Sequence, residues 1–172
     1  MSKIVISESR KQCLLDNFVE YSFEQDKDGE DLKADRDLFE SISKPEEIYF
    51  IAGNVNWDDG GIIPRWIIDS PLCTKAAALM IFWTSAPDEY MEFEFGEKIH
   101  ETAAHLKGQV DEEQTDILNM LEKLVSRFEK NDFCDIKFKF DFNYWGCKLI
   151  VNKPKWNVGE EFFESIDGIE IV

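Results

Sequence analysis

The clearest periodic pattern in the chain lies near its C-terminal half, over residues 111–130. Ile117, Leu121, Leu124 and Phe128 recur three or four positions apart, which places them on one face of an α-helix. Acidic residues begin this segment and basic residues end it, and both arrangements favour the helix dipole. The pattern therefore predicts an amphipathic helix whose apolar face packs against the core.

Two further helices are predicted in the tryptophan-rich stretch 54–83. The apolar positions after Gly61 follow helical spacing, and this helix should end near Ser70, because a residue before proline is disfavoured in the α region. Thr74 is a plausible N-cap for a second helix over 75–85. This second helix is apolar on nearly all sides, so we expect it to be buried.

Shorter helices are predicted nearer the N-terminus. One begins with Ser7 or Ser9 as its cap, a turn of helix covers 38–42, and Pro45 opens another. Between the first two, residues 26–37 are strongly acidic and are predicted to form a solvated loop.

The apolar period changes from 3.6 to 2 after the long helix. Apolar and polar residues alternate over 135–142, which predicts a half-buried strand, and 148–151 is predicted to return as the second strand of a hairpin. Residues 169–172 and 3–6 are further candidate strands. The fold class is therefore α+β, with a mostly helical body and a small antiparallel β-sheet or hairpin toward the C-terminus.

The whole chain, 1–172, is predicted to be a single domain, because this length can bury one sizeable core. Within it we expect a motif-bearing helical core at about 45–95 and a C-terminal helix plus hairpin at about 111–172. A hydrophobic content of 44% excludes a disordered acidic protein. No apolar run approaches the roughly 18 residues of a membrane span. Residues 1–10 lack the apolar h-region of a signal peptide, so a cytoplasmic protein is expected.

Charge narrows the choice of partner. The chain has 36 acidic and 19 basic residues, for a net charge of -17 at pH 7. Nucleic acid and anionic membranes repel such a surface, so we expect neither as a partner. Many soluble proteins are acidic without any functional reason. The more specific interpretation of this negative charge is that the chain binds a basic protein partner.

Two acidic clusters are candidate partner-binding residues, and the sequence does not rank them: Asp28, Glu30 and Asp31, and Asp88, Glu89, Glu92, Glu94 and Glu97.

Asp58 and Asp59 have two interpretations. They are adjacent carboxylates of the kind used in acid-base catalysis or metal binding. The glycines that follow, and Pro64 beyond them, instead favour capping of the next helix. We predict the capping role.

Other catalytic or cofactor chemistry has little support in the sequence. His100 and His105, the only histidines, are five positions apart and do not share a helix face as ligands four apart do. The four cysteines form no C-x-x-C pair, and although Cys134 and Cys147 flank the predicted hairpin, reduced thiols are expected. No common nucleotide-binding glycine motif is present, so we expect no cofactor and no metal.

Residues 45–95 carry a distinctive motif, with N-W-D-D-G, then I-P, then P-x-C-x-x-x-x-A-L-x-I-F-W. This order resembles a family of small bacterial domains of unknown function. The resemblance implies a structural motif and carries over no catalytic residue. It also implies a setting, because proteins that look like this occur as small cytoplasmic partners, some of them beside polymorphic toxins. The motif residues are Asn56, Trp57, Asp58, Asp59, Gly60, Pro64 and Trp83.

Three interpretations of function follow. The first is a bacterial immunity protein that binds and occludes a basic, nuclease-type toxin, since a nuclease presents Lys and Arg to phosphates. The second is an enzyme whose site would need Asp58, Asp59 and His100. The third is a housekeeping or adaptor domain without a toxin partner. The lack of a catalytic constellation favours the first and third, and charge and resemblance favour the first, so we predict a binding protein that is not an enzyme.

Overall fold

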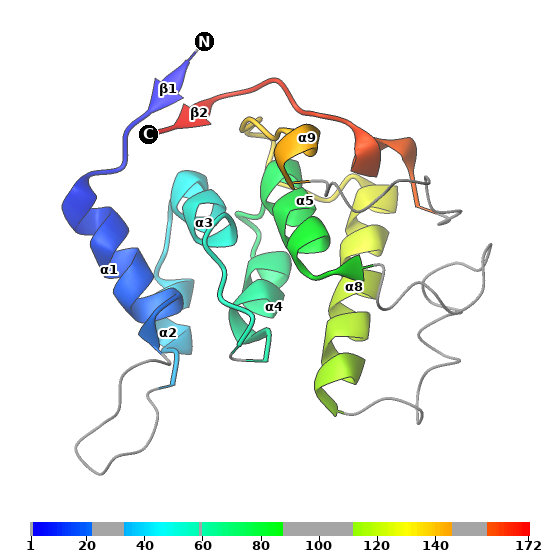
Figure 1. The fold of residues 1–172 in the computed structure, drawn as a ribbon. Coiled ribbons are helices and arrows are strands. Elements are labelled where there is room, and N and C mark those ends of the chain that lie inside the picture. Colours follow the sequence, from blue (N-terminus) through cyan, green and yellow to red (C-terminus); the bar gives the residue numbers. More distant parts are fainter. Residues whose placement is uncertain (1, 22–32, 59, 88–111, 146–157) are drawn as a thin grey trace.

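A computed structural model describes residues 2–21, 33–58, 60–87, 112–145 and 158–172 (Figure 1). Helices form the body, and two short strands lie beside one another at its upper edge in Figure 1. In chain order the described elements are β1 (Lys3–Ile4), α1 (Glu8–Phe18), α2 (Arg36–Glu40), α3 (Pro45–Ala52), α4 (Ile62–Asp69), α5 (Lys75–Thr84), α8 (Glu112–Lys130), α9 (Phe142–Trp145), the 3-10 helix η2 (Glu160–Phe163) and β2 (Glu170–Ile171).

Helix α5 lies at the centre of the body, as the sequence predicted. Every side chain from Ala76 to Trp83 is buried. The hydroxyl of Thr74 caps the helix by accepting a hydrogen bond from the Ala77 N–H at 3.3 Å. Helices α3, α4, α8 and α9 contact α5, and Phe162 of η2 packs against Phe82, so neighbours from several segments bury this apolar helix.

The other helix boundaries also follow local sequence signals. Ser7 caps α1 by accepting from the Arg10 N–H, and Pro45 is the first residue of α3. Helix α4 ends where expected, because Ser70 has an extended backbone before Pro71. The amphipathic helix predicted over 111–130 is confirmed as α8.

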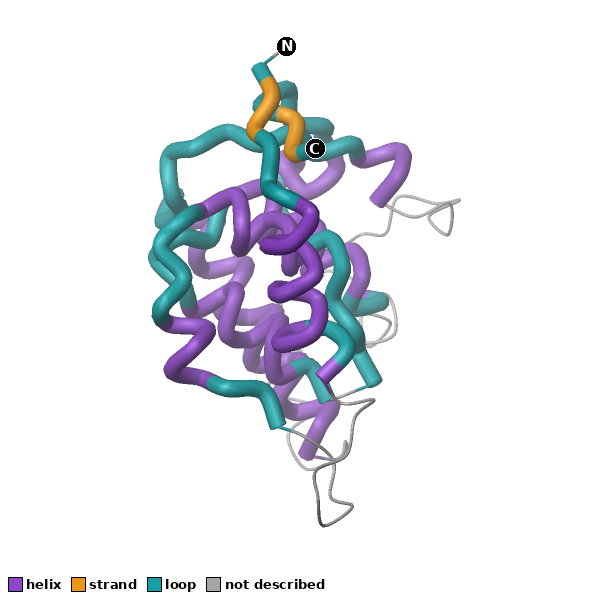
Figure 2. The backbone as a smooth tube through the Cα atoms, turned by 90° about the vertical axis from the view of Figure 1, so that its left-hand side faces the viewer, coloured by secondary structure: helices purple, strands orange, loops and turns teal. Residues whose placement is uncertain are grey.

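The predicted antiparallel hairpin is wrong. Strands β1 and β2 pair in parallel, with Lys3 opposite Glu170 and Ile4 opposite Ile171. Figure 2 shows these strands at one end of the helical body. The segment 148–151, which was predicted to complete the hairpin, lies outside the described residues.

The segment predicted as the first hairpin strand alternates in burial only from Phe138 onward, because Ile136 is exposed, and it takes a different partner. Phe138 and Phe140 are buried, and Lys139 between them is half-buried. Phe138 bridges Ile169 in parallel, and Phe140 bridges Ile166 in the antiparallel sense. A period of 2 shows which side chains face the core, but any extended segment can supply the hydrogen bonds. Helix α9 then begins at Phe142, where the strand was predicted to end.

Polar contacts hold α8 against α4 along one side. Asp116 pairs with Arg65, Lys123 pairs with Asp69, and Arg127 lies one further turn along α8. Exposed pairs of this kind contribute little individually. Arg127 is different because it is buried.

The Arg127 guanidinium joins three segments by donating to backbone carbonyls. Its Nη1 donates to the carbonyls of Ile68 and Ser70 at the end of α4, and its Nε donates to the carbonyl of Asp132 at 2.7 Å. The group also lies 5.0 Å from the centre of the Phe133 ring. Carbonyls at the end of a helix have no partner within that helix, so Arg127 satisfies the Ile68 carbonyl, whereas the Ser70 carbonyl also accepts from the Cys73 N–H.

No helix in the described part of the chain is long and apolar enough to cross a bilayer.

Replacing Arg127 with methionine tests this junction. Arg127→Met keeps most of the apolar stem but leaves the carbonyl groups without their donor, so we expect a loss of about 2–4 kcal/mol in the free energy of unfolding. Urea denaturation measures the loss, and Lys130→Met, at an exposed position of the same helix, should change stability by less than about 0.5 kcal/mol. Equal effects of the two substitutions would contradict this role.

A second prediction concerns alkaline pH. Tyr49 donates its hydroxyl to the Lys139 carbonyl at 2.6 Å, and burial, with a smaller contribution from the Glu170 carboxylate, raises the Tyr49 pKa from 10.0 to about 12. The neutral phenol therefore stabilises the folded state fully below about pH 10, and this contribution is lost as the pH rises toward 12. Thermal unfolding of wild type and Tyr49→Phe should show a stability difference that narrows between pH 9 and 11.5. A difference that stays constant over this range is the contrary result.

Candidate functional site

The N-W-D-D-G motif forms the turn between α3 and α4. The Asn56 side chain accepts a hydrogen bond from the Asp58 N–H at 3.0 Å, and the Gly60 N–H donates to the Trp57 carbonyl at 3.3 Å. Gly60 and Gly61 have φ values of 76° and 71°, in the left-handed region that favours glycine. The chain thus turns within the motif and enters α4 immediately afterwards.

The capping role predicted for Asp58 is wrong. Helix α4 begins at Ile62 with Gly61 as its N-cap, and no side chain caps it. A capping side chain must belong to the residue directly before the helix, and Asp58 lies three positions too early. Asp59 lies outside the described residues, whereas Pro64 falls in the first turn of α4, where its missing N–H costs nothing.

Trp57 gives the motif a packing role. A Cβ atom placed on Gly61 would lie 3.5 Å from the Trp57 ring and 3.8 Å from Ile117 of α8. The ring is therefore packed over the glycine and near the first half of α8. Its Nε1 is buried without a hydrogen-bond partner among the described atoms. Trp83, the last motif residue, is buried in the core and donates to the Phe162 carbonyl at 2.9 Å.

Most of the charged residues singled out in the sequence lie outside the described residues. This applies to both acidic clusters, to both histidines and to Cys147, and therefore to Asp28, Glu30, Asp31, Asp88, Glu89, Glu92, Glu94, Glu97, His100 and His105. Within the described ranges, no three His, Cys, Asp or Glu side chains are grouped so that they could hold a metal ion.

Cys73, just before α5, is joined to Cys134 by a backbone hydrogen bond. The Cys134 N–H donates to the Cys73 carbonyl at 2.9 Å, and Cys73 is fully buried. Burial raises the pKa of the Cys73 thiol from 9.0 to about 12, although nearby Arg127 partly opposes this shift. The thiol therefore stays protonated at neutral pH and is not a nucleophile there.

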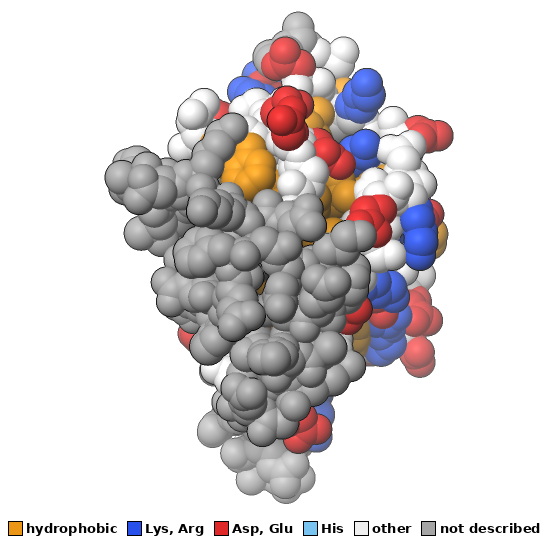
Figure 3. Space-filling model, turned by 90° about the vertical axis from the view of Figure 1, so that its right-hand side faces the viewer, with side chains coloured by type: hydrophobic (Ala, Val, Ile, Leu, Met, Phe, Trp, Pro, Cys, Tyr) orange, Lys and Arg blue, Asp and Glu red, His pale blue; other side chains and the backbone are white. Residues whose placement is uncertain are grey.

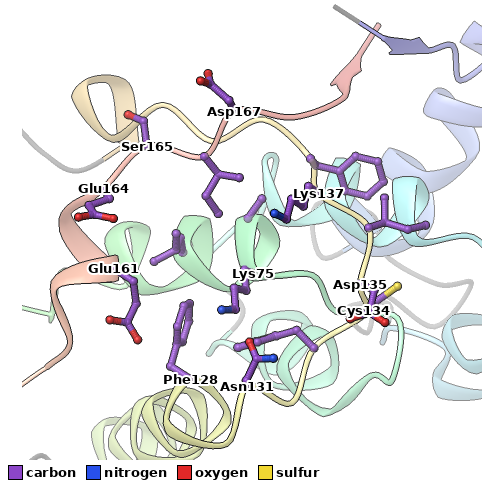
Figure 4. A pocket seen from close by; sticks show the side chains of 16 residues that line it. Lys75, Phe128, Asn131, Cys134, Asp135, Lys137, Glu161, Glu164, Ser165 and Asp167 are labelled. Carbon is purple, nitrogen blue, oxygen red and sulfur yellow. The ribbon is translucent and has the colours of Figure 1, made fainter.

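A groove of about 540 Å³ lies where four segments meet (Figure 4). Its volume falls within the range of about 300–1,000 Å³ that is typical of binding sites. Lys75, Ala76 and Leu79 of α5 and Phe128 of α8 contribute to it, together with residues from 131–138 and 161–167.

Aromatic packing fixes η2 against the helices, and backbone hydrogen bonds hold the segment that follows it. The Phe162 ring centre lies 4.3 Å from that of Phe128 and 4.7 Å from that of Phe82. Backbone hydrogen bonds in both directions, at 2.8 and 3.0 Å, join Ile166 to Phe140. The wall of the groove is thus anchored in the core.

Carboxylates outnumber ammonium groups around the groove. Four acidic residues line it, and two lysines, Lys75 and Lys137, lie among them. Across the described part of the chain, no Lys or Arg side chain forms an ion pair with any of these four carboxylates. The acidic residues are Asp135, Glu161, Glu164 and Asp167.

The side of the molecule that carries η2 also exposes apolar atoms. Figure 3 shows this side, where acidic and basic side chains surround small hydrophobic patches in the upper part, next to atoms drawn in grey.

Sequence reasoning missed this groove. The run Glu160–Phe163 and the nearby Glu164 place carboxylates around aromatic residues, which was the available local signal. Nothing in the spacing places this run beside Lys75, because the two segments are far apart along the chain. Only tertiary packing brings them together.

Comparison with known proteins identifies the family. No curated protein and no solved structure matches the chain. One family model does match the chain. The matched residues include the helices that form the floor of the groove, whereas the acidic wall at 161–167 lies outside them. A model of the family described as Domain of unknown function (DUF4274) matches residues 43–128, half of the chain, and the chain therefore belongs to this family.

Proposed function

We propose that the chain is an acidic binding protein and acts as a bacterial immunity protein, which neutralises a basic, nuclease-type toxin by covering it. The net charge of -17 supports a cationic partner, because complementary charge speeds association and disfavours wrong partners. A nuclease toxin offers such a surface, since it must bind phosphates with Lys and Arg.

The disposition of charge in the described residues is the observation that carries this proposal. Each arginine of the chain is engaged internally: Arg10 with Glu47, Arg36 with Glu40, Arg65 with Asp116, and Arg127 with backbone carbonyls. Around the groove, by contrast, carboxylates have no such partner in the described ranges. The guanidinium groups are thus engaged within the protein, and the carboxylates around the groove are available to bind a cationic partner.

An inhibitor that covers the active site of a toxin does not catalyse a reaction. The proposal therefore assigns no catalytic residue and no cofactor. It also places the chain in the cytoplasm, where a nuclease toxin would reach nucleic acid.

The neighbouring reading frame provides the direct test. We expect it to encode a large secreted protein with a Lys- and Arg-rich C-terminal domain. Expression of that domain alone should arrest growth, and co-expression of the full chain should restore it, with a stable complex on size-exclusion chromatography. A neighbour from a metabolic operon, or a toxin domain that neither binds the chain nor loses toxicity, would reject the proposal.

Salt provides a quantitative prediction for the same pair. The Debye length falls from about 10 Å at 0.1 M salt to about 3 Å at 1 M, so steering by exposed charge should largely disappear. We expect the association rate constant, measured by stopped-flow fluorescence, to fall by about tenfold or more over this range. The dissociation rate should change less, and an association rate independent of salt would contradict charge steering.

Charge reversal compares the two acidic clusters. One variant changes Glu92, Glu94 and Glu97 to lysine, and a matched variant changes Asp28, Glu30 and Asp31 to lysine. Reversal of the cluster nearer the partner should lower the association rate more, because opposite charge then becomes like charge. Unchanged rates in both variants would show that neither cluster steers the partner.

A further inference from the structure

We propose that Cys73 and Cys134 are a redox-active pair, which a small-molecule disulfide such as oxidised glutathione converts into a disulfide bond within the folded chain. Both thiols are free. The inference goes beyond the proposed function, because it depends on where these two residues lie in the fold and on no binding partner.

A backbone hydrogen bond holds the two residues within bridging distance. The Cys134 N–H donates to the Cys73 carbonyl, with 2.9 Å between the nitrogen and the oxygen. Standard bond lengths connect each of these atoms to its own Cα, so the two Cα atoms are at most about 6.8 Å apart. Disulfides join Cα atoms that are about 4.4–6.8 Å apart. The backbone therefore places the pair within the range that a disulfide can span.

The two thiols also affect each other electrostatically. Burial raises the pKa of the Cys73 thiol to about 12, and Cys134 makes a smaller contribution in the same direction. Two negative charges interact in this way only when they are near each other, because the interaction energy falls with distance. The side chains are thus neighbours, as the backbone groups are.

Both residues are held in place by contacts outside the pair. Cys73 lies in the turn between α4 and α5, and its N–H donates to the Ser70 carbonyl at 3.1 Å. The segment before Cys134 is fixed by Arg127, whose guanidinium bonds the Asp132 carbonyl at 2.7 Å. Because the chain is already ordered on both sides, bridging the thiols costs little additional conformational entropy.

The order of reaction follows from access. Cys134 is half-buried at the edge of the groove, where it is labelled in Figure 4, whereas Cys73 is fully buried. The Cys134 thiolate attacks one sulfur of the small-molecule disulfide, releases one thiolate and becomes a mixed disulfide. The Cys73 thiolate then attacks the Cys134 sulfur and releases the second thiolate. Two protein thiols are oxidised, and the reagent is reduced to two thiols that take up the two protons.

The second step depends on the small thiolate fraction of Cys73. This thiol is protonated at neutral pH, so closure is slow there and becomes faster as the pH rises. The positive charge of Arg127 favours the thiolate and opposes part of the increase in the Cys73 pKa. At neutral pH the pair therefore responds to sustained oxidation and stays reduced during a brief exposure.

Peptide mapping identifies the bond. The folded full chain is incubated with oxidised glutathione at about pH 8.5, free thiols are blocked, and the chain is digested with trypsin without reduction. Trypsin cuts after Lys and Arg, so each of the four cysteines falls in a different peptide, with Cys73 in 66–75 and Cys134 in 131–137. We expect these two peptides to be cross-linked and the intact mass to fall by about 2 Da.

Three results of the mapping would overturn the proposal. The first is a bond from Cys134 to Cys13 or Cys147. The second is a glutathione adduct on Cys134 that never resolves, and the third is no reaction at Cys134.

Single substitutions separate the two steps. Cys73→Ala should stop the reaction at the mixed disulfide, with a mass increase of about 305 Da for one glutathione on Cys134. Cys134→Ser, at a half-buried position, removes the first step, so Cys73 should stay reduced. The matched control Cys13→Ser should cross-link as wild type does. Oxidation of Cys73 in the Cys134→Ser variant, or loss of the cross-link in the control, would contradict the pairing.

Thermal unfolding tests whether the folded state accommodates the bond. The bond closes a loop of about 60 residues and restricts the unfolded chain, so the midpoint of oxidised wild type should be about 10 °C higher than that of the reduced protein. The midpoint of Cys134→Ser should not change after the same treatment. A lower midpoint in oxidised wild type would show that the bond distorts the fold, and would overturn the inference that the native geometry suits it.

Discussion

The complete burial of α5 is the constraint on which the rest of this structure depends. A helix that is apolar on all sides must be covered on all sides, and one layer of neighbouring helices does not achieve this. Helices α3, α4 and α8 supply part of the cover. The remainder comes from the C-terminal segment, where Phe162 packs on Phe82 and accepts a hydrogen bond from Trp83. The acidic wall of the groove is therefore a by-product of core packing, because the carboxylates on either side of Phe162 are carried to the surface above α5.

Local sequence signals predicted the helices well because helix ends are decided locally. Thr74 and Ser7 cap the helices that they precede, and Pro71 ends α4 at Ser70. The prediction failed for Asp58, where two glycines with positive φ moved the start of α4 beyond the reach of its carboxylate. It failed again for the sheet. Alternation over Phe138 and Phe140 identified buried faces, but the choice of partner strand depends on contacts that are distant in sequence.

The candidate site was less predictable than the fold for the same reason. Its floor comes from the family-matched residues and its acidic wall from the C-terminal segment outside the match. Charge counting identified surplus carboxylates and pointed to clusters outside the described residues, whereas the groove uses acidic residues scattered between apolar ones. Such residues have no local signature, because each follows the ordinary rule that polar side chains flank buried aromatics. Glu161 and Glu164 are exposed, whereas Phe162 between them is buried in the core.

The pairing of β1 with β2 joins two segments that are synthesised far apart in time. Lys3 lies opposite Glu170, so β1 has no partner strand until β2 has been synthesised. At about 5–20 residues per second this interval is roughly ten to thirty seconds. The helical centre is made first and can collapse earlier, since its contacts are closer in sequence. The groove wall at 161–167 emerges just before β2, so a nascent chain exposes the apolar floor before it acquires the carboxylates beside it.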